Sequence, residues 1–279
     1  MSKRPFPPPT IHPPQPTHNH THTIILLHGR GSHGAEFASE FLPSQTSASQ
    51  TLASSLPTWR WVFPTARTRW STTFQEDECA WFDAASLTDI HARQDLQTPR
   101  LRESLAYVLD ILDREVALLG GRAERLFLGG MSQGMATALW VLFCAARRVD
   151  GPLGGFVGFC WWLPFARQVE GFWDSSREGG EGALVEFFYE TLEYREGVQR
   201  RLGEGEGSVL STPVFLSHGS DDPWVSVELG RQAHFVLSGF MGRVEWSEFS
   251  WAEGDGHWVK EPEGFDDILR FLERCSGQT

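Results

Sequence analysis

The sequence lacks three features that would place the protein in a membrane, in an oxidising compartment or on nucleic acid. No apolar run approaches the roughly 20 residues that a transmembrane helix needs, so no stable membrane anchor is expected. The net charge of −12 and the pI near 5.3 argue against binding to nucleic acid or anionic lipid. No apolar leader and no C-x-x-C pair is present, so reduced thiols and a cytoplasmic location are expected. The four cysteines are Cys79, Cys144, Cys160 and Cys275.

The sequence does contain enough apolar material for a sizeable core, and it alternates between strand-like and helix-like segments. Hydrophobic residues make up 41% of the 279 residues, and no internal repeat is found. Short apolar runs predict strands, and apolar residues at helical spacing predict helices. Strands are expected at 23–28, 59–63, 154–160, 214–217 and 244–249, with a sixth leading into Gly130. Helices are expected at 34–56, 98–119, 227–237 and 262–272, with one more after residue 132. This alternation predicts an α/β fold with a mostly parallel sheet.

The helix at 98–119 has the clearest pattern. Thr98 and Pro99 are suited to its N-cap and first position, and Gly120-Gly121 to its end. Before it, residues 65–97 show no clear period and are long for a connection, which predicts a functional loop.

The N-terminal segment has a different composition. Residues 1–22 are rich in Pro and His and are expected to form a disordered leader ahead of one domain that spans 23–279. His18, His20 and His22 alternate there, but no carboxylate or Cys lies nearby to complete a metal site. We therefore predict no metal site and no cofactor.

The motif with the most chemical content is Gly130-Met131-Ser132-Gln133-Gly134. A strand-forming run precedes it and a helix-forming run follows, which is the layout of a nucleophile elbow. Such a turn holds its serine in a strained conformation at the N-terminus of a helix, with the hydroxyl exposed. We therefore predict Ser132 to be a nucleophile; the alternative is an ordinary helix N-cap.

A serine nucleophile needs a base within hydrogen-bond reach and an acid that orients the base. Loops at the carboxyl ends of parallel strands converge on one edge of the sheet. Two late loops at that edge carry suitable residues, with Asp221 and Asp222 after the strand at 214–217 and His257 after the strand at 244–249. The chain order is then Ser132, Asp222, His257, as in α/β-hydrolases. Asp221 remains an alternative acid.

Five segments carry a family resemblance. They are Leu27-His28-Gly29-Arg30-Gly31, Trp81-Phe82-Asp83, Gly130 to Gly134, Cys160 to Pro164, and His218 to Pro223. Over most of 23–272 the chain resembles the acyl-protein thioesterase / carboxylesterase (lysophospholipase-like) family of α/β-hydrolases. The resemblance implies the α/β-hydrolase fold, Asp222 rather than Asp221 as the triad acid, and an oxyanion hole formed by the backbone N–H groups of Arg30 and Gln133.

Substrate-binding residues are predicted from the aromatic segments of the same motifs. Trp81, Phe82, Trp161, Trp162 and Leu163 are expected to line an acyl pocket, with core packing as the alternative for each tryptophan. The chain departs from the family at Met135, where a small residue is usual, and at Ser220, where an aspartate is usual.

The chain also departs from the family at 174–208, which reads as an insertion. An apolar stripe at helical spacing predicts a helix there, and two hypotheses place it: a mobile flap beside the acyl pocket, or a helix packed far from the site. The flap would use Gly179-Gly180 and 203–207 as hinges.

Together these features predict a serine hydrolase that cleaves acyl thioesters or esters through an acyl-enzyme. The expected substrate is an acylated protein, a lipid or a small ester, and a monomer or weak homodimer is expected. The alternatives are a carboxylesterase for short soluble esters and a catalytically silent hydrolase scaffold that binds a small molecule or a partner.

Overall fold

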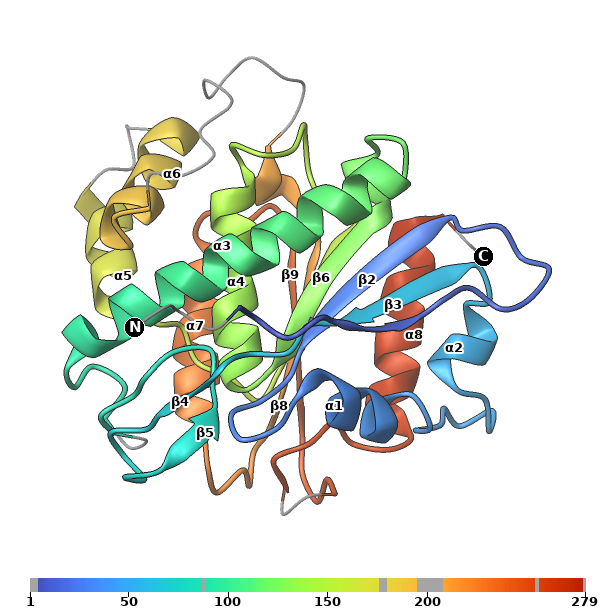
Figure 1. The fold of residues 1–279 in the computed structure, drawn as a ribbon, viewed down its shortest axis with the longest axis horizontal. Helices are drawn as coiled ribbons and strands as arrows, with labels where there is room; N and C mark the ends of the chain where they lie inside the picture. The colour runs from blue at the N-terminus through green and yellow to red at the C-terminus, as the bar shows by residue number, and fades with distance from the viewer. Residues whose placement is uncertain (1–4, 87–88, 176–179, 195–207, 254–255, 278–279) are drawn as a thin grey trace.

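The computed structural model describes residues 5–86, 89–175, 180–194, 208–253 and 256–277. Seven of its strands form one sheet with the order β1-β3-β2-β6-β7-β8-β9 (Figure 1). β1 runs antiparallel to β3 at one edge, and the other neighbours are parallel. The strands are β1 Thr10–His12, β2 His22–Leu27, β3 Trp59–Phe63, β6 Leu126–Met131, β7 Gly155–Phe159, β8 Val214–Gly219 and β9 Val244–Phe249. The prediction of an α/β fold with a mostly parallel sheet is confirmed.

The central strands are buried on both faces because helices cover both sides of the sheet. All six residues of β2 and all six of β6 are buried. Alternate side chains enter different cores, with Ile25 and Leu27 on one face and Ile24 and Leu26 on the other.

Two groups of helices form these covers, and Figure 1 shows the sheet between them. The first group packs on the Ile25 face: α3 Gln94–Leu118, α4 Gln133–Ala145, α7 Val227–Ser238, and outside them α5 Ala166–Ser175 and α6 Gly180–Thr191. The second group packs on the Ile24 face: α1 Gly34–Phe41, α2 Leu52–Ser55 and α8 Glu263–Ser276. Among the helices described, none is long and apolar enough to cross a membrane.

The N-terminal segment corrects one expectation. Residues 10–12 form β1 on the edge of β3, so the prediction of a disordered leader is wrong there. Without β1, β3 would be an edge strand with unpaired backbone N–H and C=O groups, and residues 10–12 pair with those groups. Two side-chain contacts hold the segment before β1: Phe6 stacks on Tyr107 with ring centroids 4.1 Å apart, and the Tyr107 hydroxyl donates to Pro7 O at 2.8 Å. Residues 1–4 of the predicted leader lie outside the described part of the chain.

Two predicted helices have different bounds. The weak helix expected at 34–56 is two short helices, α1 and α2, because the chain turns between them and pairs Gln45 with Thr51. α3 begins at Gln94 instead of Thr98, which leaves Pro99 inside the helix. Its first turn is held by neighbouring segments, since Gln97 Nε2 donates to Ile90 O at 3.3 Å and Gln168 Nε2 donates to Gln94 Oε1 at 2.6 Å.

The described part of the predicted insertion packs as a second layer. All thirteen residues of α4 are buried, because the sheet covers one side and α3 and α6 cover the other. Phe188 of α6 stacks on Phe143 of α4 with centroids 3.9 Å apart and meets the edge of Trp140. α6 is therefore part of the core.

Candidate active site

Ser132 lies in the turn between β6 and α4 and has the backbone geometry of a nucleophile elbow. Its φ is 52° and its ψ is −124°, a combination that a non-glycine residue rarely adopts. Two glycines make the turn possible: a Cβ on Gly130 would lie 2.6 Å from Leu27 O, and one on Gly134 would lie 2.3 Å from His28 O. The Ser132 side chain therefore stands at the N-terminus of α4, where the first helical N–H groups have no intrahelical acceptor.

The loop after β2 lies against this turn. A Cβ on Gly29 would be 3.6 Å from Ser132 Cβ, so the loop that carries Arg30 faces the serine. The His28 side chain holds this loop in place through two hydrogen bonds. The Ala66 N–H donates to His28 Nε2 at 3.0 Å, so the proton is on Nδ1, which donates to Gly29 O at 2.6 Å. Burial lowers the pKa of His28 to about 4, which keeps this residue neutral.

His257 is paired with Asp222. Nδ1 of His257 donates to Asp222 Oδ2 at 2.6 Å, and Asp222 Oδ1 accepts the N–H groups of Trp224 at 2.8 Å and Val225 at 3.0 Å. Burial alone would raise the pKa of the Asp222 carboxyl, but hydrogen bonds from His218 and His257 outweigh it and hold the pKa well below its usual range. Asp222 is therefore ionised. Its hydrogen bond orients the imidazole of His257, and its negative charge attracts it.

The neighbouring acid has a different position. Asp221 is exposed, and its Oδ2 accepts the Trp251 N–H at 2.9 Å. His218 is fully buried and supports the loop: Nδ1 accepts the Trp161 N–H at 3.4 Å and Nε2 donates to Val225 O at 2.9 Å. Of the two acids, Asp222 is thus the one in contact with His257, and its role as the triad acid stays a prediction.

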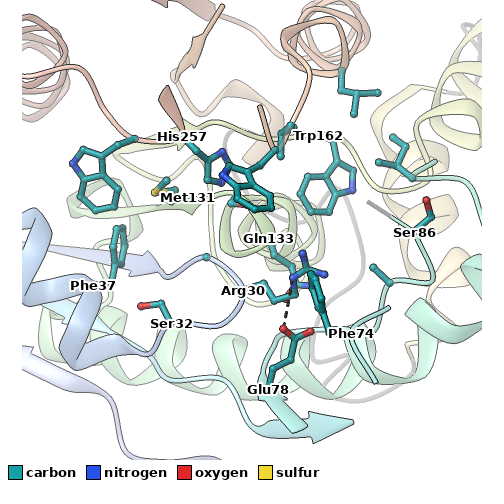
Figure 2. Close-up of a pocket in the computed structure, with 18 of the residues that line it drawn as sticks. Arg30, Ser32, Phe37, Phe74, Glu78, Ser86, Met131, Gln133, Trp162 and His257 are labelled. Atoms are coloured by element: carbon teal, nitrogen blue, oxygen red, sulfur yellow. Dashed lines mark ion pairs between the residues drawn. The ribbon is translucent and has the colours of Figure 1, made fainter. Parts of the chain in front are cut away.

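Ser132, Gln133 and His257 line one cavity of about 450 Å³, a size typical of small-molecule sites. Figure 2 shows Phe37 and Met131 on one side of it, with Trp162, Phe74 and Ser86 on the other. Charged side chains also reach its wall: Arg30, Glu40, Glu76 and Glu78. The apolar and aromatic lining is Phe37, Phe74, Ala84, Ile90, Met131, Trp162, Trp224, Val225, Leu229 and Trp258.

Only one of the five predicted substrate-binding side chains, Trp162, lines this cavity. The other four, Trp81, Phe82, Trp161 and Leu163, are core residues with at most 1% of their surface exposed. For these four the prediction is wrong; core packing, the alternative given for the tryptophans, holds for Trp81 and Trp161.

Trp81 and Phe82 nevertheless support the elbow. The Gln133 side chain accepts the Trp81 N–H through Oε1 at 2.9 Å and donates from Nε2 to Phe82 O at 2.9 Å. The Trp81 indole N–H donates to His28 O at 2.8 Å. This segment therefore ties the start of α4 to the loop that carries Arg30.

Sequence reasoning missed most of the cavity wall. The long segment at 65–97 contains a small hairpin of β4 Thr68–Trp70 and β5 Asp77–Cys79. Phe74, at its tip, and Ile90, further along, both face the cavity. The length of this connection was the one signal available, and it does not say which side chains turn inward.

The described residues contain one group of metal-ligand type, Cys160, Asp222 and His257, whose ligand atoms lie within 4.8 Å of one another. Asp222 and His257 are already joined to each other at 2.6 Å. Burial raises the pKa of the Cys160 thiol, which favours the protonated form over a metal ligand. The donor set fits a hydrogen-bonded pair better than an ion.

The structure shows where two departures from the family pattern lie. Met135 is buried over β7, where Gly158 leaves room: a Cβ on Gly158 would lie 2.5 Å from Met135 Cε. In the predicted insertion, α6 packs on α4, and its described residues do not line the cavity. The flap hypothesis is therefore wrong for α6; of its proposed hinges, Gly179 and 203–207 lie outside the described residues.

Comparison with known proteins gives a family match over more than half of the chain. The model of the family described as Phospholipase/Carboxylesterase matches residues 11–176. This range includes the loop that carries Arg30, the elbow and the tryptophan segment at 161–162.

Named relatives and solved structures agree with that match. Acyl-protein thioesterase 1 of Yarrowia lipolytica is 26% identical over 257 residues, covering 91% of this chain and 92% of that protein. Among solved structures, acyl-protein thioesterase 2 of Zea mays has a TM-score of 0.67 at 24% identity, covering 98% of this chain and all of that one. The carboxylesterase SOBER1 of Arabidopsis thaliana has a TM-score of 0.64 at 23% identity, covering 91% and 99%. Because both identities are below 25%, these structures support the fold alone.

Proposed function

Because the chain belongs to the phospholipase/carboxylesterase family of α/β-hydrolases, and so is an ester or thioester hydrolase, we propose that it works through a triad of Ser132, His257 and Asp222. The acyl donors that fit the proposal are S-acylated proteins, lysophospholipids and small esters. The names of its thioesterase relatives support thioesters, and that of its carboxylesterase relative supports oxygen esters.

The reaction has two steps. The Ser132 hydroxyl attacks the acyl carbon while His257 takes its proton, and the protonated imidazole then gives the proton to the leaving alcohol or thiol. A water molecule, deprotonated by His257, attacks the acyl-enzyme, and the imidazolium then returns the proton to the Ser132 oxygen as the acid is released. Asp222 orients the imidazole and stabilises its charge. The backbone N–H groups of Arg30 and Gln133 stabilise the oxyanion, a contribution of about 3 kcal/mol for each donor.

The observation that carries the proposal is the elbow itself. Ser132 has a positive φ at the head of α4 and lines the same cavity as a histidine that is hydrogen-bonded to a buried aspartate. A strained residue needs a surrounding structure that enforces it, and such strain is concentrated at functional sites. This feature also disfavours a silent scaffold, because binding a ligand does not require a strained serine.

A serine-directed fluorophosphonate probe and a series of 4-nitrophenyl esters and acyl thioesters from C2 to C16 test the proposal. Covalent labelling of the wild-type protein together with hydrolysis is the expected result. A long-chain preference favours the thioesterase or lysophospholipase activity, and a short-chain preference favours a carboxylesterase for soluble esters. Absence of both labelling and hydrolysis in folded protein would identify a binding scaffold instead.

A further inference from the structure

Arg30 places a positive charge in the wall of the catalytic cavity. Its side chain is only 17% exposed and lies over the ring of Phe74, with Cζ 4.5 Å from the ring centroid. Figure 2 shows this pair on the side of the cavity away from Phe37 and Met131. The wall beside Phe74 therefore holds a guanidinium group, whereas Phe37 and Met131 on the opposite side are uncharged.

The hydrogen-bonding capacity of this guanidinium is largely unused. Its one ion pair is long, with Nε 3.9 Å from Glu78 Oε2, and within the described part of the chain it donates no hydrogen bond to a protein acceptor. A guanidinium has five N–H donors in a planar fork that matches a carboxylate or a phosphate. Arg30 is partly buried, and a partly shielded cation with unused donors gains from an anionic partner. The two terminal Nη atoms are the free edge of this fork.

The surrounding acids do not remove this capacity. Glu78 meets only Nε, and Asp83 is occupied elsewhere, since Thr72 donates to both of its oxygens at 3.0 and 2.7 Å. Glu40 and Glu76 also line the cavity but are exposed at its edge, where solvent screens them. Arg30 is the one arginine among the described residues that line the cavity.

We propose that Arg30 binds an anionic group of the substrate, so that the preferred substrate is an ester or thioester with a carboxylate or phosphate a few bonds from the scissile carbonyl. This inference rests on the proposed function, because it assigns the chemistry of the substrate that Ser132 attacks. The apolar side of the cavity, with Phe37 and Met131, accommodates the uncharged remainder of the substrate.

Two matched substrate pairs measure the effect and locate the anion. On the acyl side, mono-4-nitrophenyl glutarate is compared with its methyl ester, which has the same leaving group. On the leaving-group side, the butanoyl thioester of 3-mercaptopropionate is compared with that of 3-mercaptopropionamide. The measured quantity is the ratio of kcat/KM for the anionic substrate to kcat/KM for the neutral one.

Four variants separate recognition from structure. Arg30→Met keeps the aliphatic stem and removes the charge, Arg30→Lys keeps a charge without the fork, and Glu78→Gln removes the competing carboxylate. Arg270→Met is the control. Arg270 is an exposed arginine on α8 that does not line the cavity, so this substitution removes the same charge elsewhere on the protein.

In wild type we expect a ratio above one for one of the two pairs, and in Arg30→Met a fall of that ratio by about 10- to 100-fold, the range for a hydrogen-bonded charge pair. Arg30→Lys should retain part of the ratio, Glu78→Gln should raise it and Arg270→Met should leave it unchanged. A purely structural Arg30 would instead lower both members of a pair equally.

Fluorophosphonate labelling separates the two possible failures. Labelling and hydrolysis with a ratio of one or less for both pairs, or with a ratio that Arg30→Met does not change, would overturn the inference and leave the proposed function intact. If neither labelling nor hydrolysis occurs, the proposed function fails and this inference fails with it.

Discussion

Asp222 Oδ2 lies 2.6 Å from His257 Nδ1, whereas the adjacent Asp221 accepts the backbone N–H of Trp251. Two consecutive acids on one loop therefore point to different partners. The carboxylate that reaches the imidazole is buried and also accepts two backbone N–H groups, so it is held in place, while its neighbour joins two exposed loops.

The two acids should consequently differ in their effect on the reaction. Asp222→Asn preserves the shape of the side chain but removes the charge and favours the wrong imidazole tautomer, so kcat should fall by about 10⁴-fold. Asp221→Asn should change kcat less than about tenfold, since it alters one loop contact. Steady-state kinetics on a 4-nitrophenyl ester measure both, and the opposite ranking would assign the triad acid to Asp221.

The elbow should tolerate no side chain at Gly134. An alanine there would place its Cβ 2.3 Å from His28 O, a backbone atom that cannot move aside, so Gly134→Ala should destabilise the fold by about 3 kcal/mol or more. Gly171→Ala on α5 is the matched control, because no atom lies within 4 Å of its Cβ, and it should stabilise the helix by about 0.5–1 kcal/mol. Urea unfolding measures both changes, and equal stability for the two variants would contradict the close packing of the elbow.

His28 should make the protein sensitive to acid. Its pKa is lowered from 6.5 to about 4 in the folded state, so below pH 6.5 the unfolded chain takes up a proton more readily than the folded one. The free energy of unfolding is therefore highest above pH 6.5 and decreases as the pH falls towards 4, with about 2 kcal/mol lost from this residue between pH 7.5 and 5.

His28→Gln should be less stable than wild type at pH 7.5 but should lose less stability on acidification. His18→Gln, at an exposed histidine, is the control and should follow the wild-type profile. Urea titrations at the two pH values provide the comparison. An identical pH dependence for His28→Gln and wild type would show that His28 is not the group responsible.

The second layer of helices gives a stability prediction. Phe188 of α6 is fully buried against Phe143 and Trp140, so Phe188→Ala should cost about 3–5 kcal/mol of unfolding free energy. Phe187→Ala should cost less, because Phe187 is only partly buried. Neither variant should change the acyl chain-length preference at a temperature where it is folded. A shift in that preference for Phe188→Ala would revive a role for α6 beside the cavity.

The strands and the elbow could be predicted because local chemistry determines them. Continuous apolar runs such as 23–28 read as strands buried on two faces, and the glycines at 130 and 134 mark a turn that only small residues permit. The fold class is confirmed. The roles of Ser132 and His257 remain predictions, although the structure places both on one cavity.

The cavity wall could not be predicted because residue type does not report direction. Trp161 and Trp162 are adjacent in the sequence, yet the first is buried in the core and the second faces the cavity. In the same way, the edge of β3 that recruits residues 10–12 exists only after the sheet has formed. Such features depend on tertiary contacts between distant segments.

The central claim is that Ser132 carries the acyl group, and intact-mass spectrometry of the acyl-enzyme tests it most directly. Wild-type protein mixed rapidly with a slowly hydrolysed 4-nitrophenyl ester and quenched in acid should gain the mass of one acyl group, and peptide mapping should place it on Ser132. Ser132→Ala should show no such adduct and should lose about 10⁶-fold in kcat. An adduct on another residue, or a variant that retains more than about a hundredth of wild-type turnover in a preparation free of contaminating esterase, would contradict the account.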